Sequence, residues 1–121
     1  MLKALEALER FFAEAGTDVW MAGHLPDQAA FPYLLWDAAL PAPYETEPLE
    51  AAVWFRGPDA QEQRWQCLRR LEQALPPGGR RLDVGRGCLL LRRDSPFVRF
   101  LSDRELLGIG VKVLVRNCGA A

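Results

Sequence analysis

Two segments of this 121-residue chain have an apolar side chain at every second position, and they constrain its fold more than any other feature. From Leu49 to Arg56 every second residue is apolar and faces the same way, and the same pattern runs from Ile109 to Arg116. Because neighbouring side chains of a strand point to opposite faces of a sheet, each segment predicts a strand with one buried face. The chain is therefore expected to build a sheet with an apolar layer packed on one side.

Two other segments have helical periodicity and are expected to supply that layer. Leu2 to Ala15 repeats leucine and phenylalanine at helical spacing, and Gly16 is suited to the helix C-terminus. The second helix is expected to begin after Gly57-Pro58-Asp59, with Asp59 and Glu62 forming a capping box. Its expected buried face consists of Trp65, Leu68, Leu71 and Leu75, flanked by Cys67 and Ala74. The sequence thus predicts two amphipathic helices.

Shorter segments predict the remaining strands: residues 17–22, 31–37, 81–84, 88–92 and 97–101, with a turn at Gly85-Arg86-Gly87. The predicted order is a helix, three strands, a helix and then several strands. Because strands and helices do not alternate strictly, this order favours a largely antiparallel or mixed β-sheet over a parallel one. We therefore predict a single α+β domain over residues 1–121, with two helices packed on one face of the sheet.

The net charge of −1 hides two halves of opposite charge. Residues 1–63 hold 11 acidic and 3 basic side chains, whereas residues 64–121 hold 5 acidic and 12 basic ones. Folding can interleave these charges and cancel them within one molecule. If they stay apart, the acidic side of one copy can meet the basic side of the next, and such a head-to-tail contact builds rings or filaments.

The sequence predicts no catalytic, cofactor-binding or metal site. His24 is the only histidine and is expected in an exposed loop, and neither serine lies in a nucleophile motif. The three cysteines, Cys67, Cys88 and Cys118, are far apart and lack CxxC spacing. Gly85-Arg86-Gly87 lacks a complete phosphate-loop pattern and is better explained as a hairpin turn. We therefore expect that the protein is not an enzyme and has no cofactor.

Membranes and nucleic acids are not expected partners. No run approaches the roughly 20 apolar residues that span a bilayer, and no signal-peptide pattern opens the chain, so a soluble cytoplasmic protein is expected. The arginines between Arg69 and Arg99, near Phe97 and Phe100, are an alternative phosphate-binding set. The isoelectric point of about 5.8 is nevertheless well below that of a dedicated nucleic-acid-binding protein.

Contact with other proteins is the better-supported expectation. Trp54 shares a strand face with Glu50 and Arg56, and an exposed tryptophan in such a place marks an interface. Thirteen of the fifteen basic residues are arginine, which suits bidentate pairing with carboxylates. The predicted interface residues are Trp54, Arg56, Glu50, Arg92, Arg93 and Arg99.

The order of these segments resembles the tail terminator, or tail completion, proteins of tailed bacteriophages and of phage-tail-like particles. The likeness extends over most of the chain. It is best at Leu25-Pro26 followed by Phe31-Pro32-Tyr33-Leu34, where the family commonly has a loop and then an aromatic strand, and at the closing strand from Val111 to Arg116. The proline-rich connection from Ala38 to Pro48 departs from the family pattern.

This resemblance implies a hexameric ring that caps the tail tube, stops its elongation and offers a surface to the head connector or the sheath. The implied partners are further copies of the chain, the tail tube protein, and a connector or sheath protein. The implied location is the host cytoplasm during assembly and then the virion tail. Two other interpretations remain open: another head-to-tail joining protein of the neck, and a small module that binds a ligand or nucleic acid through the arginine-rich half.

Overall fold

The computed structural model describes residues 2–120. Its elements are α1 (Leu2–Ala13), β1 (Asp18–Met21), β2 (Tyr33–Trp36), β3 (Thr46–Phe55), α2 (Ala60–Ala74), β4 (Arg80–Val84), β5 (Gly87–Asp103) and β6 (Leu106–Cys118). The strands form one six-stranded sheet in the order β1-β2-β3-β6-β5-β4. β1 and β2 are parallel and every other neighbouring pair is antiparallel. The predicted α+β fold with a mixed sheet is confirmed.

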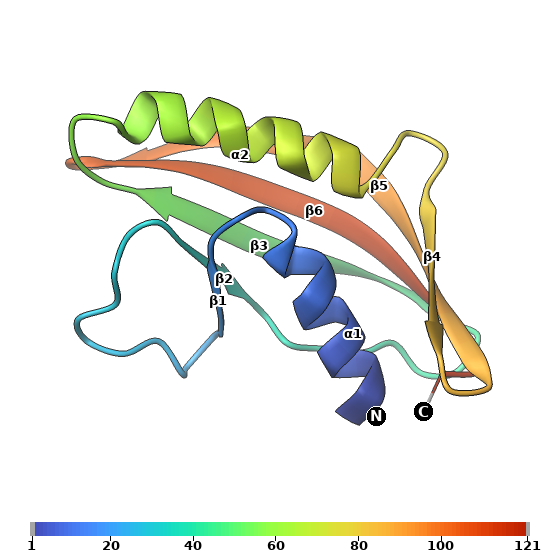
Figure 1. The fold of residues 1–121 in the computed structure, drawn as a ribbon. Helices are drawn as coiled ribbons and strands as arrows, with labels where there is room; N and C mark the ends of the chain where they lie inside the picture. The colour runs from blue at the N-terminus through green and yellow to red at the C-terminus, as the bar shows by residue number, and fades with distance from the viewer. Residues whose placement is uncertain (1, 121) are drawn as a thin grey trace.

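Both helices lie over the same face of the strongly twisted sheet (Figure 1). The apolar residues of the two alternating segments point to that face, and Val53, Ile109 and Val113 are completely buried there. From α1, Phe12 reaches Trp36 of β2, with 5.1 Å between the ring centroids. A single hydrophobic core therefore joins both helices to the sheet.

α1 follows its predicted periodicity in its second half, where Leu8, Phe11 and Phe12 are buried, whereas Leu2 is 70% exposed. Its buried residues are Ala4, Ala7, Leu8, Phe11 and Phe12. Gly16 has a φ of 87°, a left-handed conformation that glycine adopts without the steric cost of a β-carbon. The chain can therefore turn from the helix directly into β1.

α2 corrects two predictions. The capping box is wrong, because Asp59 stands at the N-cap without a side-chain hydrogen bond to the helix. Trp65 is not part of the buried face, since 44% of its surface is exposed and its ring lies 5.5 Å from that of Phe100 on β5. The rest of the predicted face is confirmed, because Leu71 and Leu75 are buried together with the flanking Cys67 and Ala74. The buried residues of α2 are Ala60, Cys67, Leu71 and Ala74.

β5 also differs from its prediction. The segments 88–92 and 97–101, expected as separate strands, belong to one 17-residue strand. Its register with β6 shifts between Arg93 and Val98, which marks a bulge around Pro96. Proline is tolerated in a strand at a bulge or at an edge. Pro96 lies at both, since the register shift surrounds it and β4 pairs only with residues 87–91 of β5.

The proline-rich connection between β2 and β3 is fastened to the end of β6. Asn117, the only buried polar residue among those described, donates from Nδ2 to the Pro41 carbonyl at 3.0 Å. The backbone N–H of Tyr44 donates to the Asn117 carbonyl, and the Asn117 N–H donates to the Glu45 carbonyl. These bonds hold the connection beside β6 and allow β3 to begin at Thr46, before the predicted Leu49.

Candidate protein-binding surfaces

The helices leave the opposite face of the sheet without a helical layer, and we call it the open face. Strand register places Trp20, Leu35 and Ala52 side by side across β1, β2 and β3 on this face. Trp54 lies between Tyr33 of β2 and Gly108 of β6. The side chains of Trp20, Tyr33, Leu35, Ala52 and Trp54 are half-buried. A cluster of mostly large apolar side chains therefore remains partly exposed to water. Such a patch on a folded chain is typical of a protein-binding surface.

Two glycines of β6 shape the centre of the open face. A β-carbon at Gly108 would lie 2.8 Å from the Trp54 ring, which shows that this ring lies directly on the β6 backbone. Leu101 of β5 packs in the same way above Gly110, where a β-carbon would lie 3.4 Å from its side chain. Sequence reasoning missed this pair, although glycine inside a strand is a known sign of a close approach.

Four of the six predicted interface residues share the open face. Glu50 pairs across the strands with Lys112, with 3.4 Å between the carboxylate oxygen and Nζ. Trp54 lies on the same face of β3, further along the strand. Arg92 and Arg99 are exposed and lie opposite Leu114 and Gly110, on the same face. The open face therefore carries apolar side chains beside charged groups of both signs.

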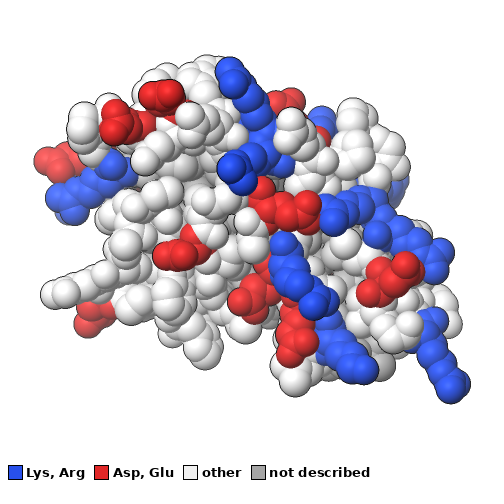
Figure 2. All heavy atoms as spheres, in the orientation of Figure 1, with Lys and Arg blue, Asp and Glu red and all other residues white. Residues whose placement is uncertain are grey.

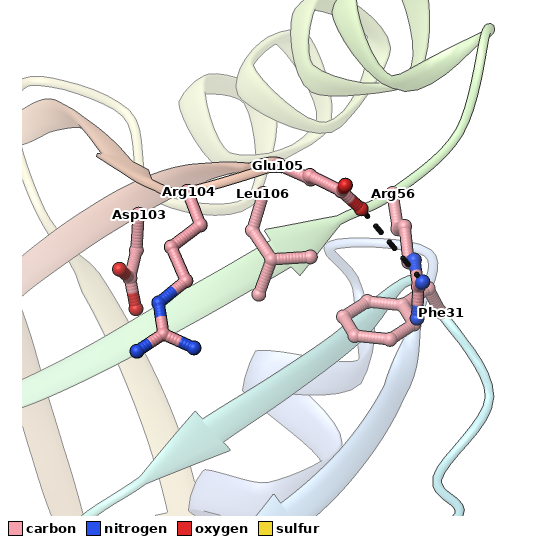
Figure 3. A pocket seen from close by; sticks show the side chains of 6 residues that line it. All are labelled: Phe31, Arg56, Asp103, Arg104, Glu105 and Leu106. Carbon is pink, nitrogen blue, oxygen red and sulfur yellow. Dashed lines mark ion pairs between the residues drawn. The ribbon is translucent and has the colours of Figure 1, made fainter.

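Arg56 lies elsewhere, at a cavity of about 510 Å³ between the loop before β2 and the turn from β5 to β6 (Figure 3). Its guanidinium is 3.8 Å from Glu105 and 6.0 Å from the centre of the Phe31 ring. Arg104 stands in that turn with a φ of 55°. The other lining residues are Asp103 and Leu106, so the cavity offers charges of both signs.

Arg93 points to the helix side of the sheet. Its Nε donates to the Leu75 carbonyl at 2.7 Å, and a second guanidinium nitrogen donates to the Glu72 carbonyl at 3.1 Å. The guanidinium also lies 4.7 Å from the centre of the Phe97 ring. A cation in this position satisfies carbonyls at the C-terminus of α2 and complements the helix dipole. These hydrogen bonds are made within the chain, and the role of Arg93 as an interface residue stays a prediction.

This arrangement predicts that two adjacent arginines have different effects on stability. Arg93→Ala is expected to lower the free energy of unfolding by about 1–2 kcal/mol, because two carbonyls at the end of α2 lose a charged donor. Arg92→Ala removes an exposed side chain from the open face and is expected to change it by less than about 0.5 kcal/mol. Urea denaturation followed by circular dichroism measures both. Equal effects of the two substitutions would contradict the assigned role of Arg93.

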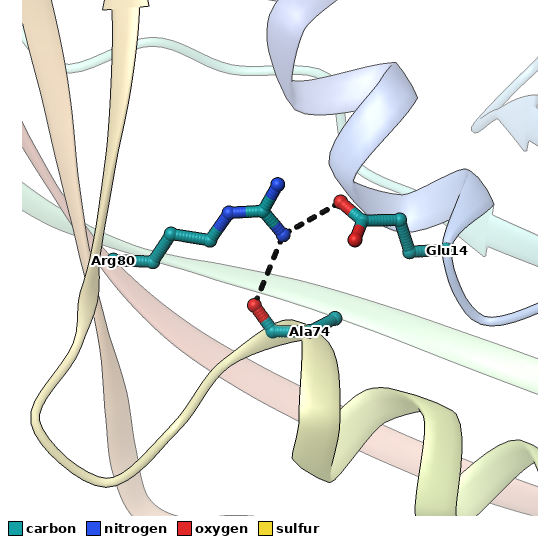
Figure 4. Close-up of polar contacts among 3 residues, drawn as sticks. All are labelled: Glu14, Ala74 and Arg80. Atoms are coloured by element: carbon teal, nitrogen blue, oxygen red, sulfur yellow. Dashed lines mark hydrogen bonds and ion pairs between the residues drawn. The ribbon is translucent and has the colours of Figure 1, made fainter.

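Part of the charge asymmetry is cancelled within the molecule. Arg80 of β4 donates to the Glu14 carboxylate at 2.6 Å and to the Ala74 carbonyl at 3.1 Å, joining β4 to the ends of both helices (Figure 4). Lys112 and Glu50 form a second pair between the two halves of the chain. Figure 2 shows acidic and basic side chains interleaved on the face seen there. Acidic and basic side chains are thus mixed on that face rather than gathered into two separate patches.

Few groups that could carry chemistry lie together among residues 2–120, and the exception is the pair Cys88 and Cys118, whose thiols interact. No cluster of three or more potential metal ligands occurs among residues 2–120. His24 is exposed in the loop between β1 and β2, as predicted. All three cysteines are free thiols, and burial raises the pKa of Cys67 to about 12. This thiol is therefore protonated at neutral pH and is a poor nucleophile.

Comparison with known proteins adds no family to this description. No protein-family model, curated protein or solved structure matches the chain. In the part of the chain that the structure describes, no helix is both long enough and apolar enough to cross a membrane. The functional argument therefore depends on the surfaces themselves and on the resemblance in segment order.

Proposed function

We propose that the protein is a structural subunit of a phage tail: a tail terminator that forms a ring, caps the tail tube and stops its elongation. The observation that carries this proposal is the open face, where Trp20, Tyr33, Leu35 and Trp54 remain partly exposed beside charged side chains. Aromatic residues and arginine are enriched where proteins bind each other. The resemblance in segment order supplies the kind of assembly.

The proposed partners follow from that assembly. Copies of the chain form the ring, which is hexameric by the resemblance, and the ring binds the tube protein on one side. A head connector or sheath protein binds the other side. The protein acts in the host cytoplasm during assembly and then remains in the virion tail.

The first test is the size of the particle in solution. Size exclusion with light scattering, at about 100 μM protein and at low and high salt, should show a discrete ring of about six subunits that loosens as salt screens its charges. The same protein should appear at one end of tubes assembled from the tube protein of the same particle, as seen by negative-stain electron microscopy. It should also limit their length.

Single substitutions connect this test to the open face. Trp54→Ala should weaken either ring formation or tube capping at least tenfold, since a partly buried tryptophan at an interface contributes more than about 1.4 kcal/mol. Leu2→Ala removes an apolar side chain from α1 that is 70% exposed, and it should leave both activities unchanged. A monomer at both salt concentrations that never binds tube ends would refute the proposal. Rings that bind only a head connector would identify a neck protein instead.

A further inference from the structure

Both sides of the sheet have strand edges without a neighbouring strand among the described residues. β1 pairs only with β2 and ends the sheet on one side. On the other side β4 ends the sheet, and because it covers only residues 87–91 of β5, β5 has no outer neighbour from Arg92 to Asp103. An uncovered edge presents unpaired backbone N–H and C=O groups and is a template for another strand.

The outer part of β5 is regular enough to accept a strand. After the bulge, residues 98–103 pair with β6 without interruption, and we call the outer side of this segment the distal β5 edge. Proteins blunt free edges with prolines and bulges, but Pro96 and the bulge precede this segment. Phe100, at its middle, has 51% of its surface exposed. The distal β5 edge is thus uncovered, and an exposed aromatic side chain lies at its middle.

The distal β5 edge is basic. Arg99 extends from it on the open face, and Arg104 follows in the turn. On the helix side, the Arg64 guanidinium lies 4.5 Å from the centre of the Phe100 ring. Asp103 is the only acidic residue of the segment. With the turn included, the guanidinium groups of Arg64, Arg99 and Arg104 outnumber the carboxylates of Asp103 and Glu105, and Glu105 is paired with Arg56.

The β1 edge has the opposite charge. Asp18 is exposed on the open face at the start of β1. On the helix side, a groove of about 450 Å³ separates β1 from α1. The residues that line this groove include Glu6, Glu9, Arg10, Ala13, Asp18 and Val19. Three carboxylates beside one guanidinium make this edge complementary to the distal β5 edge.

We propose that the distal β5 edge of one copy pairs with the β1 edge of the next copy, so that the sheet continues from subunit to subunit. This inference rests on the proposed ring and specifies its contact. A regular contact between two different edges is heterologous and closes into a ring when the rotation permits. The occupant of each edge is therefore a second copy of this chain.

Strand direction agrees with this contact. β1 and β2 are parallel, and three antiparallel steps then lead through β3 and β6 to β5, so β5 runs opposite to β1. Subunits related by an axis along the strands keep these directions, which makes the new pair antiparallel. Antiparallel pairing is slightly more stable per residue than parallel pairing.

The side chains agree with it as well. When the helix sides of two copies are aligned, Phe100 faces the groove of its neighbour, where Ala13 and Val19 offer apolar surface. In the same arrangement, Arg99 of one copy and Asp18 of the next copy lie together on the open face. A contact between two distal β5 edges would instead oppose arginines, and one between two β1 edges would oppose carboxylates, and like charges across strands are destabilising.

Charge reversal tests the contact directly. Arg99→Glu and Asp18→Arg should each raise the concentration for half-assembly at least tenfold, because each places like charges at every contact. An equal mixture of the two variants should assemble again, since the introduced glutamate meets the introduced arginine at one contact and the native pair forms at the next. Because the two variants must alternate, only rings with an even number of subunits can form. The double variant should assemble alone. Arg86→Glu, in the turn between β4 and β5 and outside both edges and the open face, should leave assembly unchanged.

Hydrogen exchange supplies an independent measurement on the wild-type protein. Backbone amides in residues 18–21 and 98–103 should become protected in the ring, while the loop around His24 should not change. Wild-type rings that are insensitive to both charge reversals, or that leave both edges unprotected, would overturn the edge contact and leave the ring function standing. Wild-type protein that remains monomeric even on tubes would refute the ring function itself.

Discussion

Trp36→Ala is expected to lower the free energy of unfolding by about 3–5 kcal/mol, the range for removing a large aromatic side chain from a core. Trp36 is 1% exposed and packs its ring against Phe12, so it joins β2 to α1. Alanine would leave a cavity between them that the helix cannot fill without moving. Because small domains have a total stability of about 5–15 kcal/mol, urea denaturation should show the variant close to unfolding.

Trp36→Phe is the matched control and should behave differently. The indole N–H of Trp36 is buried and has no hydrogen-bond acceptor among residues 2–120. An unpaired buried donor costs about 1–3 kcal/mol, and phenylalanine removes it while keeping most of the ring. We therefore expect this substitution to cost less than about 1.5 kcal/mol. If Trp36→Phe lowered the free energy of unfolding as much as Trp36→Ala, the unpaired N–H of Trp36 would not destabilise the wild-type protein.

The sheet core was predictable because burial on a strand follows a local rule. Alternation identified Leu49, Val53 and Val113 as inward-facing, and all of them are buried. Helical periodicity predicted most of the buried face of α2 as well, since Leu71 and Leu75 are buried together with the flanking Cys67 and Ala74. It did not predict where that face ends, because Trp65 is 44% exposed and lies beside Phe100 of β5. Long-range packing therefore decided the limit of the buried face.

The bulge in β5 explains why the candidate surface was only partly predictable. Arg92 and Arg99 are an odd number of residues apart, so a regular strand would place them on opposite faces. The register shift between Arg93 and Val98 brings Arg99 to the open face that Arg92 shares, whereas Arg93 faces the helices by ordinary alternation with Arg92. The sequence pattern around Pro96 indicated a break between two strands. Only the pairing with β6 reveals that the strand continues and that its side chains change faces.

The free edges were hidden for a related reason. They depend on the order of strands in the sheet, and in particular on β4 being shorter than β5. The charge difference between the two halves of the sequence indicated a head-to-tail contact without locating it. The sheet order then places the acidic half at the β1 end and the basic half at the β5 end. Composition thus indicated the kind of contact, and topology supplied its position.

Asn117→Leu is expected to lower the free energy of unfolding by about 2–4 kcal/mol, because it leaves two buried backbone groups without partners. The Asn117 side chain donates to the Pro41 carbonyl at 3.0 Å and accepts from the Ala120 N–H at 2.8 Å. Leucine is similar in size to asparagine, but its side chain can neither donate nor accept a hydrogen bond. The loss should also loosen the connection between β2 and β3, which should become more sensitive to limited proteolysis around Pro41.

The neighbouring residue of the same strand separates this effect from a general change in polarity. Arg116 is exposed on the open face, so Arg116→Leu should change stability by less than about 0.5 kcal/mol and leave the connection resistant to protease. If Asn117→Leu unfolded at the same urea concentration as Arg116→Leu, the side-chain bonds of Asn117 would not fasten the connection. The backbone bonds from Tyr44 and Asn117 persist in both variants, so a large difference between them isolates the contribution of the amide side chain.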